Sequence, residues 1–209
     1  MLRILIADDH TVVRRGLRQI LLDEFPNVEI AEVADAEELI KKVMTAKWDV
    51  VVSDLSMPGR SGLDALQQIK LSHPDLPVLI LSIHPEEQYA LRALKAGASG
   101  YLSKDTAPNE LVKAVQKVLL GKKYISQAIA QKLASSFSSD AGLSLHDSLS
   151  DREFDVMKLL ANGKSVSEIA EILSLSATTV STYRARLMVK MDLKSNADLT
   201  KYAIENKLI

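Results

Sequence analysis

The sequence has no cysteine among its 209 residues, and it has no hydrophobic run long enough to cross a bilayer. The lack of cysteine excludes a disulfide-stabilised scaffold, thiolate-bound zinc, iron–sulfur clusters and cysteine catalysis, and it favours a reducing compartment. The chain passes directly from Met1-Leu2-Arg3 into a strand-like segment, so we expect no secretory leader. These absences together predict a cytoplasmic protein that does not bind a membrane.

A large excess of charge of one sign is also missing. The formal net charge is −1, which argues against a protein that coats nucleic acid in bulk or binds membranes through basic clusters. Hydrophobic residues make up 47% and charged residues 25%, which is typical of a folded protein and excludes disorder and low-complexity fibres. Because a domain usually holds about 100–200 residues, the length predicts one large domain or two small ones.

The first part of the chain alternates short runs of Val, Ile and Leu with amphipathic stretches. Near-continuous apolar runs are typical of strands covered on both faces, as in a parallel sheet. Five strand–helix units in a row predict an α/β domain with a doubly wound, five-stranded parallel sheet of the flavodoxin-like type. The expected strands are 3–7, 28–33, 49–53, 77–81 and 99–102, and the expected helices are about 11–24, 35–46, 62–72, 86–96 and 107–120.

The pattern changes beyond residue 122. A short helix is predicted at 125–137, and the sixteen residues 135–150 include seven serines, which is typical of a flexible linker. The remaining sequence has only helical periodicity, with helices expected at about 151–162, 166–173, 177–191 and 195–206, and Gly163 stands where a helix should end. The predicted organisation is a first domain at 1–122, a linker at 123–148 and a small all-α, four-helix domain at 149–209.

Polar residues stand where the strands of the first domain end. Asp8 and Asp9 follow the first strand, Asp54 follows the third, Ser82 ends the fourth and Lys104 follows the fifth. In open α/β sheets, ligands bind outside the carboxyl ends of the strands, so these side chains should meet at one edge. Converging carboxylates repel one another and need a cation, and oxygen ligands suit Mg²⁺. A lysine opposite them suits an anion, so the cluster predicts phosphoryl transfer with an aspartate as nucleophile.

Four motifs carry these residues in order: I-A-D-D-H (6–10), S-D-L-S-M-P-G-R-S-G (53–62), L-S (81–82) and G-Y-L-S-K-D (100–105). With these motifs the first domain resembles the receiver domain of two-component response regulators of the NarL/FixJ family. The resemblance implies a sensor histidine kinase as the phosphodonor and Mg²⁺ as the cofactor.

The resemblance also implies roles for single residues. Asp54 would accept the phosphoryl group. Asp9, Asp54 and the backbone carbonyl of Ser56 would bind Mg²⁺, with Asp8 acting mostly through water. Lys104 would contact the acyl phosphate.

Ser82 and Tyr101 complete the site implied by the resemblance. The Ser82 hydroxyl would donate to a phosphoryl oxygen, and Tyr101 would move inward behind it. Taken singly, every residue of the site also has an ordinary structural interpretation. The alternatives are helix N-caps for Asp8 and Asp9, a turn residue for Asp54, a cap of the next helix for Ser82, a solvated charge for Lys104 and a core side chain for Tyr101.

The second domain contains a candidate helix-turn-helix. Its first helix, turn and second helix are expected at 165–173, 174–177 and 178–191. At about 100° per residue, the apolar face of the second helix should pack inward, and it consists of Val180, Tyr183, Leu187 and Met191. The opposite face carries hydroxyls, small apolar groups and cations, which suits a DNA major groove. The predicted DNA contacts are Thr178, Thr179, Ser181, Thr182, Arg184, Ala185, Arg186, Val189 and Lys190.

Five segments of the second domain resemble the LuxR-type DNA-binding domain: L-S-D-R-E (149–153), L-L-A-N-G-K-S (159–165), E-I-A-E-I-L (168–173), T-V-S-T-Y-R (179–184) and K-M-D-L-K-S-N-A-D-L (190–199). The T-V-S-T-Y-R string is similar to the BvgA/GacA-like branch. The family more often has Lys or Arg at position 181 and His at 183, where this chain has Ser and Tyr. The resemblance implies double-stranded promoter DNA as a partner, a homodimer when phosphorylated, and RNA polymerase as a further candidate partner.

We therefore predict a phosphorylation-dependent transcriptional regulator that is not an enzyme. One alternative is a Mg²⁺-dependent phosphatase that works through an aspartyl phosphate. Such enzymes use a second aspartate two positions after the nucleophile, where this chain has Ser56, so turnover should be poor. Another alternative is a receiver whose helical tail binds protein or RNA instead of duplex DNA.

Overall fold

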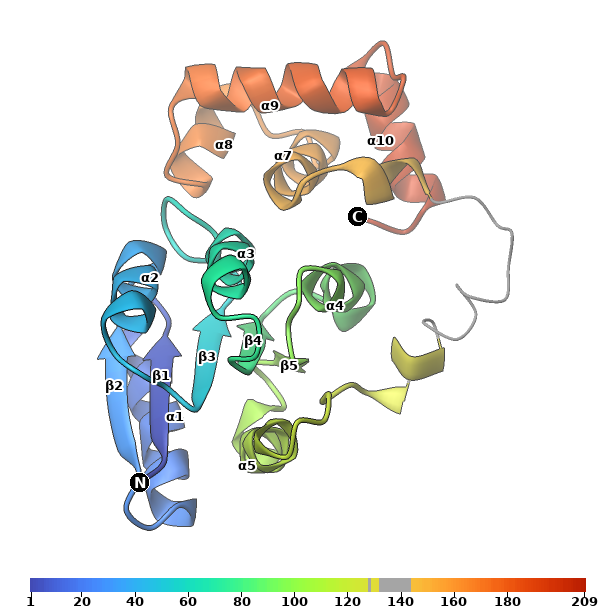
Figure 1. Ribbon diagram of the computed structural model, residues 1–209. Helices are drawn as coiled ribbons and strands as arrows, with labels where there is room; N and C mark the ends of the chain where they lie inside the picture. Colours follow the sequence, from blue (N-terminus) through green and yellow to red (C-terminus); the bar gives the residue numbers. More distant parts are fainter. Residues whose placement is uncertain (128, 132–143) are drawn as a thin grey trace. The chain divides into compact units, whose positions relative to one another are not determined.

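The structure is a computed structural model that describes residues 1–127, 129–131 and 144–209 (Figure 1). The chain divides into two compact units, Met1–Phe137 and Ser138–Ile209. Within the described residues, no helix combines the length and the hydrophobicity that crossing a bilayer requires.

Five strands form the centre of the first unit: β1 (Arg3–Ala7), β2 (Glu29–Val33), β3 (Val50–Asp54), β4 (Val78–Ser82) and β5 (Gly100–Ser103). All neighbouring strands are parallel, and their order is β2-β1-β3-β4-β5. β3 and β4 are buried along their whole length, as their unbroken apolar runs predict. The doubly wound parallel sheet predicted from the sequence is therefore confirmed.

Helices cover both faces of this sheet (Figure 1): α1 (Thr11–Glu24), α2 (Ala36–Thr45), α3 (Gly62–Ser72), α4 (Glu86–Lys95) and α5 (Ala107–Leu119). α1 and α5 pack against each other, and Leu17, Leu21 and Leu111 join them to the apolar side chains of β1 and β3. α2 and α3 pack together on the other face. α3 begins with a capping box, in which the side chains of Ser61 and Asp64 each accept a backbone N–H.

The second unit is all-helical and consists of a 3₁₀ helix, η1 (Leu145–Ser148), followed by α7 (Asp151–Ala161), α8 (Val166–Ile172), α9 (Ala177–Lys190) and α10 (Asn196–Glu205). A serine side chain caps the N-terminus of each α-helix, because Ser150, Ser165, Ser176 and Ser195 all accept a backbone N–H. Phe154 on α7 is fully buried in the core. Gly163 follows α7 with a φ of +80°, so the predicted helix end is confirmed.

Both ends of the predicted linker contact the neighbouring units. Tyr124 forms a parallel bridge with Gly100 at the start of β5. At the other end, His146 Nδ1 lies 2.9 Å from the hydroxyl of Tyr202 on α10. Much of the linker, and of the short helix predicted at 125–137, lies outside the described residues, so the domain limits stay a prediction.

Candidate functional site

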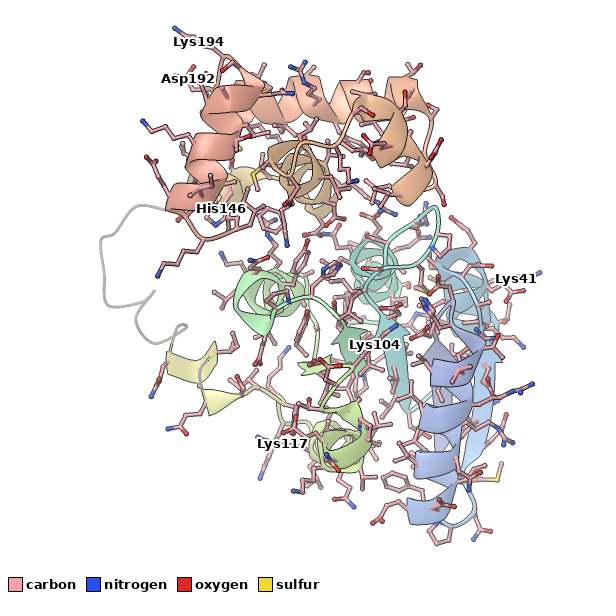
Figure 2. All side chains as sticks on the ribbon, turned by 180° about the vertical axis from the view of Figure 1, so that it is seen from behind. Lys41, Lys104, Lys117, His146, Asp192 and Lys194 are labelled. Carbon is pink, nitrogen blue, oxygen red and sulfur yellow. The ribbon has the colours of Figure 1, made fainter. Side chains whose placement is uncertain are left out.

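The carboxyl ends of β1, β3 and β5 bring two aspartates and a lysine together. Asp8 follows β1, Asp54 ends β3 and Lys104 follows β5. Because β1 and β3 are neighbours in the sheet, Asp8 and Asp54 lie at the same edge, and they are 0% and 2% exposed. Lys104, labelled in Figure 2, joins them: its Nζ lies 2.7 Å from Asp8 Oδ2 and 2.8 Å from Asp54 Oδ2.

Burial governs the protonation of these three groups. Burial raises the pKa of Asp54 above its ordinary value, although the hydrogen bond and charge of Lys104 act in the opposite direction. Burial alone would lower the pKa of Lys104, but its hydrogen bonds to Asp54 and Asp8 outweigh this effect and the pKa is raised. The ammonium thus stays charged, and the raised pKa makes Asp54 a more basic carboxylate than an exposed aspartate.

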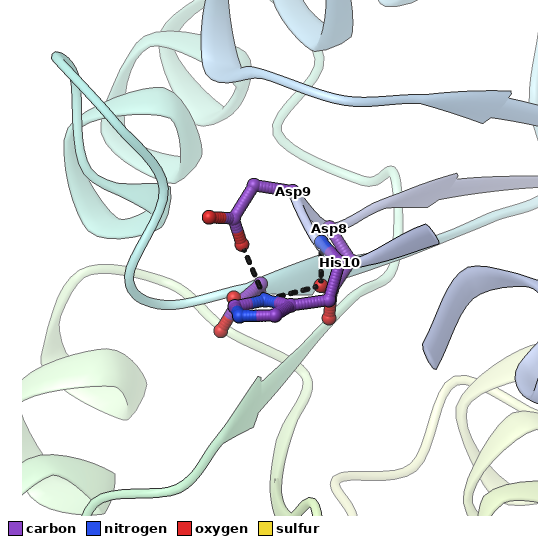
Figure 3. A group of neighbouring side chains, drawn as sticks. Asp8, Asp9 and His10 are labelled. Atoms are coloured by element: carbon purple, nitrogen blue, oxygen red, sulfur yellow. Dashed lines mark hydrogen bonds and ion pairs between the residues drawn. The ribbon is translucent and has the colours of Figure 1, made fainter. Parts of the chain in front are cut away.

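Asp9 and His10 extend the cluster, and Figure 3 shows the imidazole ring beside the two carboxylates. The N-cap residue of α1 is His10, so the alternative that Asp8 or Asp9 caps this helix is wrong. We name Asp8, Asp9, Asp54 and Lys104 the acidic pocket. Its three carboxylates and one ammonium leave a charge of −3 + 1 = −2, which a divalent cation would neutralise. The oxygen donors fit such an ion.

Ser82 and Tyr101 lie beside the pocket and are almost fully buried. Ser82 Oγ accepts a hydrogen bond from the backbone N of His84 at 2.9 Å. The N-cap residue of α4 is Pro85, so the alternative that Ser82 caps this helix is wrong. The Tyr101 hydroxyl donates to the carbonyl of the same His84 at 3.0 Å. The backbone of residue 84 therefore connects the two predicted switch residues.

Ser56 lies on the loop that follows β3. Its backbone N donates to Asp54 Oδ1 at 3.2 Å. Its hydroxyl is 3.0 Å from Nε2 of His84, so these two side chains meet beside the predicted phosphorylation site. The His84 ring also stacks on Tyr89 of α4, with 4.7 Å between ring centroids.

The helix predicted to read DNA presents the expected faces. Val180, Leu187 and Met191 are buried, as the helical wheel predicts. Tyr183, which the wheel also places on the inward face, is only half-buried. Thr179 and Arg184 are also half-buried. We name six of the exposed side chains of this helix the α9 outer face: Thr178, Ser181, Thr182, Ala185, Arg186 and Val189.

The cations of α9 differ in how they are held. Arg184 donates from Nε and Nη2 to Asn196 Oδ1 on α10. Lys190 Nζ lies 2.6 Å from Oε2 of the buried Glu153. Among the described residues, the Arg186 guanidinium has neither an ion pair nor a hydrogen bond. Arg186 is therefore the α9 cation most available to a phosphate.

Two family models match the sequence in the order of the two units. One, described as a response regulator receiver domain, matches residues 4–116. The other, described as bacterial regulatory proteins of the luxR family, matches residues 147–203.

Similar proteins match over the whole chain. Response regulator UvrY of Escherichia coli (strain K12) is 39% identical over 209 residues, with 100% of this chain and 96% of UvrY covered. Response regulator GacA of Pseudomonas aeruginosa is 36% identical over 211 residues, with 100% of this chain and 98% of GacA covered.

Solved structures agree with these matches. RcsB from Salmonella enterica serovar Typhimurium, bound to promoter rprA in the presence of the phosphomimetic BeF3−, has a TM-score of 0.62 and 28% identity, with 97% of this chain and 98% of that chain covered. A LuxR-family two-component response regulator from Aurantimonas sp. has a TM-score of 0.59 and 37% identity, with 66% of this chain and 98% of that chain covered.

Proposed function

Because the chain belongs to the bacterial response regulators that join a receiver domain to a LuxR-type DNA-binding domain, we propose that phosphorylation of Asp54 controls its binding to promoter DNA. It is a two-component transcriptional regulator of the NarL/FixJ family, in the GacA/UvrY branch, as its motifs indicate. The phosphodonor is a sensor histidine kinase, and both act in the cytoplasm.

The observation that carries this proposal is the acidic pocket. A carboxylate oxygen of Asp54 attacks the phosphorus of a phosphohistidine, the P–N bond breaks, and an acyl phosphate forms. Lys104 lies 2.8 Å from Asp54 Oδ2, where it can contact the incoming phosphoryl oxygens. Asp9, Asp54 and the Ser56 carbonyl would hold Mg²⁺, with Asp8 acting mostly through water, and the bound ion would neutralise the negative charge that develops on those oxygens.

Phosphorylation alters the surroundings of Ser82. Asp54 changes from a charge of −1 to one near −2, and it gains strong acceptor oxygens. The Ser82 hydroxyl donates a hydrogen bond to one of these oxygens and moves toward Asp54. Because Ser82 Oγ accepts a hydrogen bond from the backbone N of His84, this movement draws the backbone of residue 84 inward. Tyr101 is bonded to the same backbone segment and follows it. The loop after β4 and the helix α4 form the element that reports phosphorylation.

The α9 outer face enters the major groove. Hydroxyl groups on this face contact bases or phosphates, and Ala185 and Val189 can meet thymine methyl groups. RcsB, which is similar to this chain, has been solved as dimers on DNA. We infer a homodimer on a two-fold symmetric promoter site, with RNA polymerase as a candidate partner. Thr179, Arg184 and Lys190 orient α9 at the edges of this face.

The protein is a regulator without sustained turnover. Position 56, which holds an acid/base aspartate in phosphatases that use an aspartyl phosphate, is a serine. Ser56 bonds to both Asp54 and His84, and we infer that Ser56 and His84 flank the path of the water that attacks the acyl phosphate. We expect them to set how long Asp54 stays phosphorylated.

A selection from a randomised duplex library tests the proposal. The full chain is incubated with Mg²⁺, with and without acetyl phosphate, and the bound duplexes are sequenced. We expect acetyl phosphate to enrich a palindromic sequence. Asp54→Asn should abolish the enrichment, whereas Asp23→Asn, the same change at an exposed position on α1, should leave it intact. An equal response from the Asp54 variant would contradict the mechanism.

A further inference from the structure

His10 lies beside the acidic pocket, although the sequence analysis gives this residue no role. Its Nδ1 is 2.7 Å from Asp9 Oδ1 and 3.3 Å from Asp8 Oδ1 (Figure 3). One ligand atom from each of Asp8, Asp9, His10 and Asp54 can be chosen so that all lie within 4.8 Å of one another. Atoms at such spacing can surround a single metal ion.

Two oxygens of this group are each paired with one nitrogen atom. Asp8 Oδ2 and Asp9 Oδ1 are both buried atoms, and the Asp8 side chain is fully buried. Lys104 Nζ lies 2.7 Å from Asp8 Oδ2, and His10 Nδ1 lies 2.7 Å from Asp9 Oδ1. An ionised carboxylate oxygen has two lone-pair sites, so each of these oxygens keeps one that a bound cation can use.

The chain holds His10 at this position through its backbone. The backbone N of His10 donates to Asp8 Oδ1 at 2.8 Å, immediately before α1 begins. The imidazole is 65% exposed, so it can adjust to an ion without disturbing the core. Nδ1 is the nitrogen that faces the carboxylates.

We propose that His10 supplies an imidazole ligand in the acidic pocket, so that the pocket binds a divalent transition-metal ion more tightly than its oxygen ligands alone would. Imidazole nitrogen suits ions such as Co²⁺ and Ni²⁺, whereas Mg²⁺ strongly prefers oxygen. Mg²⁺ therefore gains nothing from His10, and Co²⁺ gains a ligand. The inference rests on the metal site of the proposed function and adds a ligand and a metal class to it.

Calorimetric titration of the full, untagged chain with Co²⁺ alone and with Mg²⁺ alone tests the inference. His10→Ala should weaken Co²⁺ binding by about tenfold or more. The same variant should not weaken Mg²⁺ binding, because Mg²⁺ takes oxygen ligands and His10 supplies none. The control is His73→Ala, which removes an exposed imidazole that bonds to the neighbouring Ser72 and should alter neither titration.

A spectroscopic measurement separates ligation from a structural effect. Bound Co²⁺ is paramagnetic, so an imidazole coordinated through Nδ1 gives a strongly shifted ring N–H resonance that exchanges with solvent, which we expect in the wild-type protein and not in His10→Ala, where only oxygen ligands remain. If Co²⁺ affinity and shifted resonances survive in His10→Ala while Mg²⁺ still binds, the role of His10 is refuted and the proposed function stands. If neither ion binds the wild-type chain, the metal site of the proposed function fails as well.

Discussion

The two units present their functional side chains in opposite ways. In the first unit the acidic pocket is buried, and Lys104 already contacts both Asp8 and Asp54. In the second unit the α9 outer face is exposed, and Val189 at its end is 82% exposed. Buried charges interact strongly and must be matched within the protein, whereas exposed charges are screened by solvent. The pocket therefore responds to a single added charge, whereas the α9 face depends on a partner that excludes water.

Lys104→Met should disturb the buried half of this comparison more than any other single change. It leaves the carboxylates of Asp8 and Asp54 facing each other without a cation. Loss of one member of a buried ion pair costs about 3–5 kcal/mol. We expect the free energy of unfolding, measured by urea denaturation in the presence of a chelator, to fall by about that amount.

A matched control makes the Lys104 experiment specific. Lys41→Met removes an exposed lysine on α2, labelled in Figure 2, and should leave stability nearly unchanged. Addition of Mg²⁺ should restore part of the stability of Lys104→Met, because a bound cation replaces the lost ammonium. Equal stability of the Lys104 variant and wild type would show that the pocket is solvated and not buried.

The elements that the sequence predicts best are those with local signals. The predicted strand 3–7 and the predicted helices 11–24 and 62–72 match β1, α1 and α3 residue for residue. The predicted strand 28–33 begins one residue later as β2. Apolar periodicity and serine caps are short-range features, so a linear reading of the chain detects them.

The composition of the candidate site was also predictable, because parallel strands have their carboxyl ends at the same edge of the sheet. The directions in which long side chains point could not be predicted from the sequence. Lys190 is predicted as a DNA contact because it is a cation of this segment, but its ammonium bonds Glu153, 37 residues earlier in the chain. His10 points toward Asp8 and Asp9 because backbone contacts hold it there. The direction of Lys190 depends on a tertiary contact and that of His10 on a contact within a local turn, and periodicity encodes neither.

Arg186→Ala tests whether the exposed α9 outer face binds DNA phosphates. Because this guanidinium has no ion-pair partner among the described residues, its removal should weaken DNA binding without altering stability. The slope of log affinity against log salt should decrease in magnitude by about 1, as expected when a single cation no longer neutralises a DNA phosphate. Fluorescence anisotropy with the selected duplex at several salt concentrations measures this slope. Arg15→Ala, an equal loss of charge at an exposed position on α1, should leave the slope as it is.

Lys190→Ala should behave in the opposite way to Arg186→Ala. Glu153 is 3% exposed, and Lys190 is 41% exposed, so solvent screens the pair and we expect a loss of stability of about 1 kcal/mol. The salt dependence of DNA binding should stay close to that of the wild type. Lys201→Ala, which breaks an exposed pair with Glu205, should cost less in the same denaturation assay. A reduced salt slope in Lys190→Ala would instead place this ammonium on a DNA phosphate.

Glu168→Gln should produce the smallest effect, because Glu168 is exposed. Backbone and side-chain hydrogen bonds from Ser165, aided by Lys164, lower the pKa of Glu168 from an ordinary 4.5 to about 2. Because the folded-state pKa is the lower one, the charged carboxylate stabilises the fold above about pH 4.5, and this contribution disappears as the pH falls through about 2. Glutamine keeps the capping box but has no charge. In thermal melts followed by circular dichroism, the wild type should therefore exceed the variant in Tm at neutral pH and converge with it near pH 2. The control is Glu171→Gln, the same change on α8 outside the capping box, whose Tm difference from the wild type should not depend on pH in this way. If the Tm difference between the wild type and Glu168→Gln were the same at every pH, the charge of Glu168 would not stabilise this cap.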